Sequence, residues 1–429
     1  MPKAGRLSAG WVGTLAVLLL SAAAMLCSVS PLRAEEMKIG VIYSQTGKYA
    51  TNGQHMRNGV ALAAQIVEED KGVPLSGRKR ANLIPVFRDD ESDIARGAQI
   101  VSRMLEDEDI RVFLGPFSAG LSEAIAPLTE AERAPLVLYN GSVSALMSRP
   151  YTSVYALHSL PESYLGAVVD RIVAAEESAG RDVTALTAGL VAASDPYSRI
   201  VIEGARVALE KVDVRIVMDD EIEHRAKDLS PTLIRVKAQQ PDILLVSGHA
   251  AVARVLMRQV RELQVAVPYL GLTHCFAARI VEVDAGAAAN TLCPVEWHQG
   301  AVGRVERMFG GGENFLDRFR DAYGYTPPPI AAQAAAAFQL IADAIRRAGS
   351  IDPARVRSTL SEIDTLTING RVRFDQRGRN TGRTARVVRI TESGSELVPA
   401  TGKITLPLRE PLSKDSDEDA DKTTEGSKQ

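Results

Sequence analysis

Residues 38–53 read KIGVIYSQTGKYATNG, and this stretch decides the fold. Its first six residues, 38–43, are rich in β-branched and aromatic side chains, which predicts a strand. The polar and glycine-containing residues that follow predict a loop. Residues 55–69 then repeat apolar side chains at helical spacing. The chain therefore begins as a strand, a polar loop and an amphipathic helix.

The same unit recurs along the chain. In the first half, strands are predicted at 82–88, 111–114 and 135–138, with helices at 95–106 and 122–131 between them. The pattern then restarts, with strands at 186–193, 214–218, 242–247 and 268–272 and helices at 164–175, 199–209, 229–238 and 252–263. Such alternation predicts parallel sheets with helices on both faces. The fold class is α/β, with two doubly wound parallel-sheet lobes.

The N-terminal 34 residues have the pattern of a secretory signal peptide. Lys3 and Arg6 precede an uncharged apolar run, and a small residue, Ala34, stands before the first acids. The run is shorter than the roughly 20 residues that a membrane anchor needs. A lipid anchor on Cys27 is the other alternative, although Leu26 is larger than the residue expected before such a cysteine. We expect export to the periplasm.

The whole chain has a net charge of −3, and removing the three positive charges of residues 1–34 leaves −6. A mildly acidic chain lacks the basic surface of a nucleic-acid-binding protein, so no nucleic acid is expected as a partner. Cys275 and Cys293 remain after cleavage. In an oxidising compartment they could form a disulfide or stay as two buried thiols.

The loops that follow the predicted strands hold the candidate site residues. Ser118 lies in a Gly-Pro-Phe-Ser-Ala-Gly stretch directly before a helix. Unpaired N–H groups at a helix start could bind a carboxylate there, or Ser118 could simply cap the helix. The stretch lacks the G-x-S-x-G pattern of a serine hydrolase. No catalytic residue is assigned, and we expect no enzyme activity.

Cofactor motifs are also missing from the sequence, because neither a Walker A segment nor G-x-G-x-x-G occurs. We therefore expect no cofactor. His249, His274 and His298 fall near late strand ends and could meet around a metal. They lack the short spacing of a zinc motif, so they are interpreted as separate polar residues of a cleft, with no metal site.

An ordered set of short motifs runs from about residue 38 to 390. The motifs are Ile39-Gly40-Val41, Ser44-x-Thr46-Gly47, Tyr49-Ala50, Asn52-Gly53, Gly59, Leu62-Ala63, Asp89-Asp90-x-Ser92-Asp93, Gly115-Pro116, Ala332-Gln333-Ala334 and Asn369-Gly370-x-Val372-x-Phe374-Asp375. Together and in this order, they resemble the Leu/Ile/Val-type substrate-binding proteins of ABC transporters.

The resemblance implies the type I periplasmic binding fold, in which two lobes close over a small-molecule ligand. Residues 35–156 and 299–365 would form the N-terminal lobe, and 157–293 and 375–403 the C-terminal lobe. Crossings are expected near 156–160, 294–298 and 366–374. Residues 404–429 would be a disordered acidic tail, since residues 413–429 hold six acids and little apolar surface.

The resemblance also implies a set of ligand contacts between the lobes. By position, these are Asn52, Ser118, Ala119, Gly141, Ser142, Val143, Tyr197, His249, Thr273 and His274. Trp297 would be either a wall of the cleft or a core residue beside a crossing strand.

Three departures from the family pattern bear on the ligand. Amino-acid binders place a hydroxyl residue where Ala119 falls, a threonine near Val143 and an acid near Thr273. That acid pairs with the ligand's ammonium group. The ligand is therefore expected to be amino-acid-like, an aromatic acid or an amide. The expected partners are this ligand and an inner-membrane permease, and the alternative role is a periplasmic sensor that feeds a signalling partner.

Overall fold

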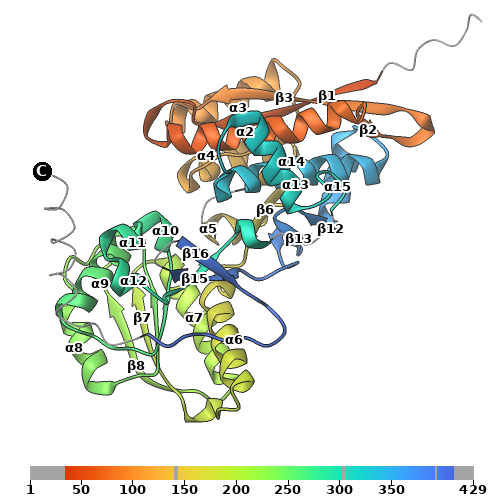
Figure 1. Cartoon of the computed structure of the whole chain (residues 1–429). Helices are drawn as coiled ribbons and strands as arrows, with labels where there is room; N and C mark the ends of the chain where they lie inside the picture. The colour runs from red at the N-terminus through yellow and green to blue at the C-terminus, as the bar shows by residue number, and fades with distance from the viewer. Residues whose placement is uncertain (1–33, 140–143, 302–305, 392–393, 410–429) are drawn as a thin grey trace, which may run out of the picture.

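The computed structural model describes residues 34–139, 144–301, 306–391 and 394–409, which form two α/β lobes (Figure 1). The predicted signal peptide, apart from Ala34, lies outside these ranges. Within them, no helix combines the length and the apolar character that crossing a bilayer requires.

The first lobe is built on a seven-stranded sheet with the order β14-β6-β5-β4-β1-β3-β2. Its strands pair in parallel except for the short edge strand β2. Their bounds are β1 Glu35–Tyr43, β2 Val73–Pro74, β3 Arg80–Asp89, β4 Phe113–Leu114, β5 Leu136–Leu138, β6 Val154–Ser159 and β14 Arg379–Asn380.

Helices cover both faces of this sheet and bury two apolar clusters against it. They are α2 Ala50–Glu69, α3 Ile94–Glu106, α4 Ala119–Ala131, α5 Ser144–Met147, α13 Gly312–Tyr323, α14 Pro329–Ala348 and α15 Pro353–Ser361. A two-stranded sheet of β12 Asp364–Thr367 and β13 Gly370–Arg373 lies beside α14. Burial on both faces explains why the strands are nearly continuous apolar runs.

The second lobe has a seven-stranded sheet with the order β16-β15-β11-β10-β9-β7-β8. Strands β7 to β11 are parallel, and β15 and β16 add an antiparallel edge. The strands are β7 Thr187–Ala193, β8 Arg215–Ile222, β9 Ile243–Ser247, β10 Tyr269–Leu272, β11 Leu292–Val295, β15 Arg386–Thr391 and β16 Gly394–Val398. The helices are α6 Ser163–Ser178, α7 Pro196–Glu210, α8 Ser230–Gln239, α9 Ala250–Glu262, α10 Cys275–Ala278, α11 Ile280–Val283 and α12 Ala285–Ala288. Two mixed α/β lobes confirm the predicted fold class.

The chain crosses between the lobes after β6, after β11 and after β14 (Figure 1). The first two crossings lie where the sequence predicts them. The third prediction, near 366–374, is wrong, because Val372 and Phe374 are buried in the first lobe's core and β14 still pairs with β6. Residues 381–385 make this crossing, so the segment 375–403 contributes to both sheets.

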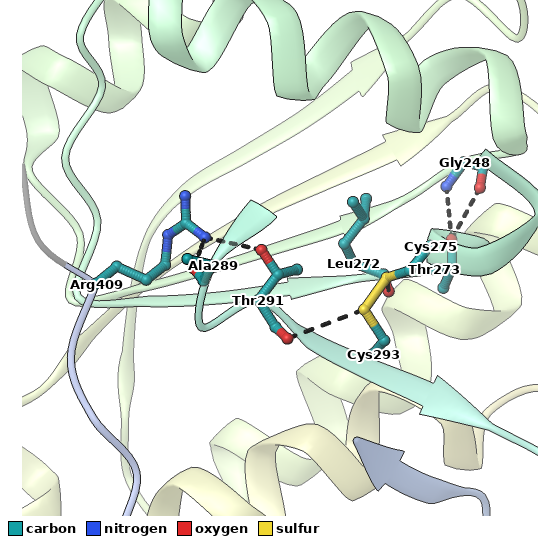
Figure 2. The surroundings of a disulfide bond; sticks show 8 residues. All are labelled: Gly248, Leu272, Thr273, Cys275, Ala289, Thr291, Cys293 and Arg409. Carbon is teal, nitrogen blue, oxygen red and sulfur yellow. Dashed lines mark hydrogen bonds between the residues drawn. A yellow bond between two sulfur atoms is a disulfide. The ribbon is translucent and has the colours of Figure 1, made fainter. Parts of the chain in front are cut away.

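The start of the predicted disordered tail is packed against the second lobe. Ile404 and Leu406 are buried in its core. The Arg409 guanidinium donates to the Ala289 carbonyl and the Thr291 hydroxyl (Figure 2). It also donates to the Ala287 carbonyl. The prediction of disorder from residue 404 is therefore wrong for 404–409, because two apolar side chains and this arginine anchor the backbone. Residues 410–429 lie outside the described ranges.

Cys275 and Cys293 form a disulfide that links α10 to β11 (Figure 2). Of the two alternatives for these cysteines, the structure has the bonded one. Both residues are buried in the core of the second lobe. The bond closes the segment that carries α10, α11 and α12, three one-turn helices that pack against α9.

Helices α2 and α14 pack closely because one contact point has no side chain. A Cβ atom added at Gly59 would lie 2.1 Å from the Ala331 carbonyl oxygen. The alanine run at 331–337 supplies the matching smooth face, and all seven of its residues except Gln333 are alanine and fully buried. This contact fixes the outer helical layer of the first lobe.

The Gly59→Ala substitution is expected to destabilise the protein by about 1–3 kcal/mol, because a methyl group cannot fit against the α14 backbone. Differential scanning calorimetry would show a lower melting temperature. Gly166→Ala in α6 is the matched control, since its Cβ would meet nothing closer than 3.4 Å. Equal melting temperatures for Gly59→Ala and the wild type would contradict this account of the packing.

Replacing both cysteines by serine is expected to lower the free energy of unfolding by about 3 kcal/mol, the loop-closure value for cysteines 18 positions apart. Urea unfolding of the oxidised protein and the double variant measures the difference. Reduced wild-type protein should behave like the variant, and an unchanged urea midpoint in both would show that the disulfide does not stabilise the fold.

Candidate ligand-binding cleft

A cavity of about 1010 Å³ lies between the lobes. Phe117, His158 and Arg379 line it from the first lobe, and Tyr164, Tyr197 and His274 from the second. Clefts of this kind are preferred sites for small molecules. The cavity lies beyond the carboxyl ends of parallel strands, where ligands of open α/β sheets bind.

On the first lobe, the start of α4 approaches this cavity. Ser118 is the N-cap residue, and its Oγ accepts a hydrogen bond from the Leu121 N–H at 3.3 Å. Ser118 and Ala119 are half-buried, and Asn52 is half-buried in the first turn of α2. Next to the cap, Phe117 contacts the Tyr49 ring at a centroid distance of 5.1 Å. Gly141, Ser142 and Val143 lie outside the described residues.

On the second lobe, the predicted residues Tyr197, His249 and His274 come together. The Tyr197 ring centroid is 5.7 Å from that of His249 and 5.4 Å from that of His274. The two imidazole centroids are 5.0 Å apart. Each residue follows a different strand, β7, β9 or β10, so neighbouring parallel strands bring distant residues to one wall.

Thr273 has a different position from the one expected of a ligand contact. Its side chain is buried, and Oγ1 donates to the Gly248 carbonyl at 2.8 Å and accepts from the Gly248 N–H at 3.1 Å (Figure 2). Both hydrogen-bonding functions of the hydroxyl are thus used by the backbone. Thr273 ties the end of β10 to the loop that carries His249.

Burial sets the protonation of this wall. Desolvation and then the neighbouring His249 lower the pKa of His274 to about 4. Desolvation also raises the pKa of Tyr197 above its ordinary value. At neutral pH the wall therefore offers a neutral imidazole and a neutral phenol, which are groups suited to stacking and hydrogen bonding rather than to ion pairing.

Two further residues that line the cavity, His158 and Tyr164, are not predicted from the sequence. His158 is the last residue but one of β6, and its Nε2 lies 2.8 Å from the Tyr139 carbonyl oxygen. Because a carbonyl oxygen can only accept, Nε2 is the protonated nitrogen. Tyr164 is in the first turn of α6, 6.4 Å from Tyr197 between ring centroids. Neither residue stands after a predicted strand, so only the crossing near 156–160 indicates that this region reaches the cleft.

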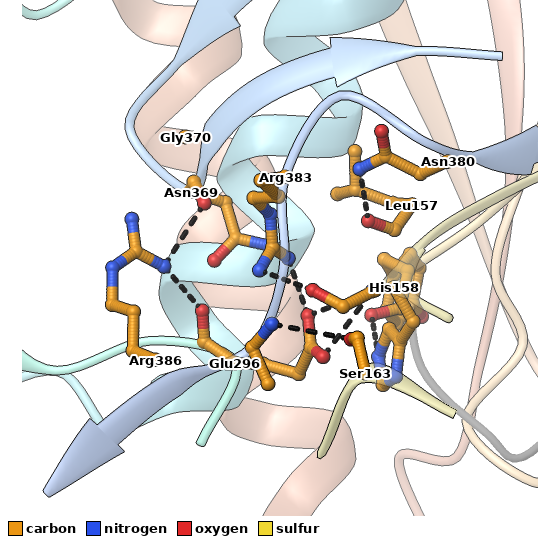
Figure 3. Close-up of polar contacts among 12 residues, drawn as sticks. Leu157, His158, Ser163, Glu296, Asn369, Gly370, Asn380, Arg383 and Arg386 are labelled. Atoms are coloured by element: carbon orange, nitrogen blue, oxygen red, sulfur yellow. Dashed lines mark hydrogen bonds and ion pairs between the residues drawn. The ribbon is translucent and has the colours of Figure 1, made fainter. Parts of the chain in front are cut away.

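The three crossings meet at the buried carboxylate of Glu296 (Figure 3). It accepts hydrogen bonds from the Ser159 N–H at 3.2 Å and from the Tyr164 hydroxyl at 2.7 Å, and it pairs with Arg383. Arg383 also donates to the Ser159 hydroxyl at 2.7 Å. Residues of the first, second and third crossings therefore share one ion-pair network.

The charge of Glu296 is held in place by these partners. Burial alone raises the pKa of this carboxyl, but the charges of Arg383 and His158 and the hydrogen bonds from Tyr164 and Arg383 outweigh it and lower the pKa to about 2. Glu296 is therefore ionised throughout the neutral range. A buried pair of this kind is costly to break, because the remaining charge has no water to solvate it.

Trp297 is a core residue. Its side chain is 5% exposed, and its ring contacts Phe315 edge-on at 6.3 Å within the apolar cluster of the first lobe. Of the two alternatives for this residue, the structure has the core position beside a crossing. Trp297 does not line the cavity.

The three histidines considered together in the sequence do not all meet. His249 and His274 are neighbours, but His298 lies apart, with Nε2 3.2 Å from the Ser395 hydroxyl. His224 takes the third place instead, with its ring centroid 5.3 Å from that of His249. It follows β8, whose end lies four residues beyond the predicted one.

Two lobes, three crossings and a cavity between the strand ends define a two-lobed binding protein. The family model described as Periplasmic binding protein matches residues 36–395. The chain belongs to this family, and it is a substrate-binding protein of the type found in ABC transporters.

Named relatives and solved structures agree with this family. An "Amino acid binding protein" of Pseudomonas aeruginosa is 22% identical over 353 residues, 80% of this chain and 87% of the relative. A Desulfitobacterium hafniense ABC transporter substrate-binding protein in complex with Leu has a TM-score of 0.67 at 19% identity, covering 85% of this chain and all of that one. An R. palustris solute-binding protein in complex with benzoate has a TM-score of 0.58 at 17% identity, covering 89% and 98%.

The Glu296→Gln substitution is expected to destabilise the protein at pH 7 by about 3–5 kcal/mol, because it leaves Arg383 buried without a counter-charge. The stabilisation by ionised Glu296 is fully present above an unfolded pKa near 4.5 and is lost as the pH falls toward the folded pKa of about 2. The gap in melting temperature between variant and wild type should therefore narrow below about pH 4.5.

Thermal unfolding followed by circular dichroism from pH 7 to pH 3 measures this gap. Glu221→Gln is the control, because Glu221 also pairs with an arginine, Arg199, but is 51% exposed. Its melting temperature should stay close to that of the wild type. A gap for Glu296→Gln that does not change with pH would exclude the assigned charge state.

Proposed function

We propose that this chain is the periplasmic substrate-binding component of an ABC uptake transporter and that it takes a small aromatic carboxylate. The observation that carries the proposal is the cavity whose walls come from both lobes and whose second-lobe lining includes the rings of Tyr164, Tyr197 and His274. Binding, rather than chemical conversion of the ligand, is the function that this arrangement supports.

Closure of the two lobes is the proposed mechanism. A ligand that contacts Phe117 on one side and Tyr197 on the other gains both sets of contacts only when the lobes approach. It therefore binds the closed state more tightly and shifts the equilibrium toward it. A permease in the inner membrane would recognise the closed form.

The rings support a planar ligand. Tyr164, Tyr197, His249 and His274 form a chain of contacts with centroid distances between 5.0 and 6.4 Å. A flat apolar group can stack on such a wall or pack against its edges. Phe117 and Tyr49 provide a second aromatic contact on the opposite lobe.

The polar groups support a carboxylate without an ammonium group. The N-terminus of α4, with Ser118 as its cap, offers N–H donors and the positive end of a helix dipole. Thr273 stands where amino-acid binders have an acid, and its hydroxyl is committed to Gly248. The benzoate complex of the R. palustris relative is consistent with this choice of ligand.

The periplasmic location rests on the family and on the predicted signal peptide in residues 1–34. The net charge of −6 that remains after removal of these residues argues against adhesion to anionic lipid or nucleic acid. The solved ABC transporter substrate-binding proteins that this chain resembles support a permease partner.

Isothermal titration calorimetry of the mature protein with benzoate, leucine and benzamide tests the ligand class. Benzoate is expected to bind more tightly than both other compounds, because only benzoate combines a flat ring with a lone carboxylate. The Tyr197→Ala variant should bind at least about tenfold more weakly, and Ser118→Ala should lose about 1–2 kcal/mol, the scale of a hydrogen bond to a charged group.

Ile234→Ala is the control variant, because Ile234 lies on α8 and is 59% exposed. It should leave the affinity unchanged. Tighter binding of leucine would replace the aromatic-acid assignment with an amino acid. Equal affinities of wild type and Tyr197→Ala for the best ligand would remove the ring wall from the site.

A further inference from the structure

The ring wall continues, through His249, into a group of metal-type ligands, and the proposed function does not use the other two, Asp195 and His224. One oxygen or nitrogen atom from each of Asp195, His224 and His249 lies within 4.8 Å of the others. His224 Nδ1 is 3.3 Å from Asp195 Oδ2, and His249 Nε2 is 3.5 Å from Asp195 Oδ1. We propose that these three side chains bind a divalent transition-metal ion of the Zn²⁺ class.

The spacing fits such an ion. Ligand atoms at 2.0–2.1 Å from a tetrahedral Zn²⁺ are separated from each other by roughly 3.4 Å. The His224 and His249 nitrogens lie 3.3 and 3.5 Å from the Asp195 carboxylate, the first from Oδ2 and the second from Oδ1, and the three ligand atoms lie within 4.8 Å of one another. Two imidazoles and one carboxylate form a donor set typical of zinc sites with an open position, and the same set suits Ni²⁺ and Cu²⁺.

Hydrogen bonds outside the set hold the Asp195 carboxylate in place. The Asp195 carboxylate caps α7, accepting from the Ser198 N–H at 3.0 Å and from the Ser198 hydroxyl at 2.7 Å. Supporting contacts of this kind fix the orientation of metal ligands.

The two histidines have comparable support through their loops. The His224 N–H donates to the Ser194 hydroxyl at 3.1 Å, so the loops after β7 and β8 are joined. Gly248, the residue before His249, is held by the Thr273 hydroxyl. The ligands thus come from three neighbouring strand ends with fixed backbones, and the side chains of His224 and His249 remain 42% and 41% exposed, which leaves room for an ion to enter.

The site adjoins the cavity without being part of its lining. His249 contacts Tyr197 and His274, which both line the cavity. The Nδ1 atom of His274 is buried and has no hydrogen-bond partner among the described residues. A metal ion at Asp195 would therefore lie beside the ring wall, with its open coordination position available to water or to an oxygen of a bound molecule.

Calorimetric titration of the mature, tag-free protein with ZnCl₂ tests the proposal in the absence of any organic ligand. One equivalent of Zn²⁺ is expected to bind, and excess EDTA should reverse the binding. His224→Ala and His249→Ala should each weaken it by more than about tenfold. Asp195→Asn should also weaken it, while asparagine keeps the helix cap and thereby the fold.

His55→Ala and His298→Ala are the matched controls, because both remove a half-buried histidine far from the cluster. They should bind Zn²⁺ like the wild type. With Co²⁺ as the probe, visible absorption bands of a low-symmetry site should be present in the wild type and lost in His249→Ala. Absence of stoichiometric Zn²⁺ binding, or binding unchanged in both His224→Ala and His249→Ala, would overturn the proposal, whatever benzoate does.

Discussion

One buried carboxylate, that of Glu296, joins the three chain crossings that connect the two lobes. Glu296 lies on the second crossing and holds the first through Ser159 and Tyr164 and the third through Arg383. Arg386 extends the same group by donating to the main-chain oxygens of Glu296 and Asn369 (Figure 3). Removing either partner of this buried ion pair would leave a charge that water cannot solvate, so the pair holds the three crossings together.

This network also connects the hinge to the ligand site. Tyr164 donates to Glu296 and at the same time lines the cavity beside Tyr197. His158 lies in the first crossing, close enough to Glu296 for the carboxylate charge to act on its imidazole. In the proposed mechanism, a ligand that touches Tyr164 would contact a partner of the carboxylate that joins the crossings, so recognition and lobe closure would share a side chain.

Much of the fold is predictable because buried parallel strands have a strong signal. Strands β7, β9 and β10 begin within one residue of their predicted starts, since each is a short, mostly apolar run.

The end of β8 and the position of the third crossing are not predictable from an apolar pattern. β8 is an edge strand with half-exposed residues, so Asp219, Asp220 and Glu221 resemble a loop although they continue the strand. β14 has only Arg379 and Asn380, which carry no apolar pattern.

The same physics limits the prediction of the site. Residues directly after predicted strands, such as Tyr197, His249 and His274, were found because strand ends converge. The sequence does not indicate His224, because its pattern predicts that β8 ends at residue 218, four residues too early. Asp195 has the pattern of an ordinary helix cap, which it also is. Thr273 and Trp297 stand at family positions, but their burial is decided by neighbours far away in the chain, Gly248 and Phe315.

The path of the chain has a consequence for any attempt to divide this protein. The first lobe needs residues from both halves of the sequence, and the second is completed only by β15, β16 and the segment that ends at Arg409. No single cut in the polypeptide can release one intact lobe. Neither lobe can therefore be expressed alone as one continuous piece of the chain. Deleting residues 404–409 would expose the core of the second lobe, in which Ile404 and Leu406 are buried.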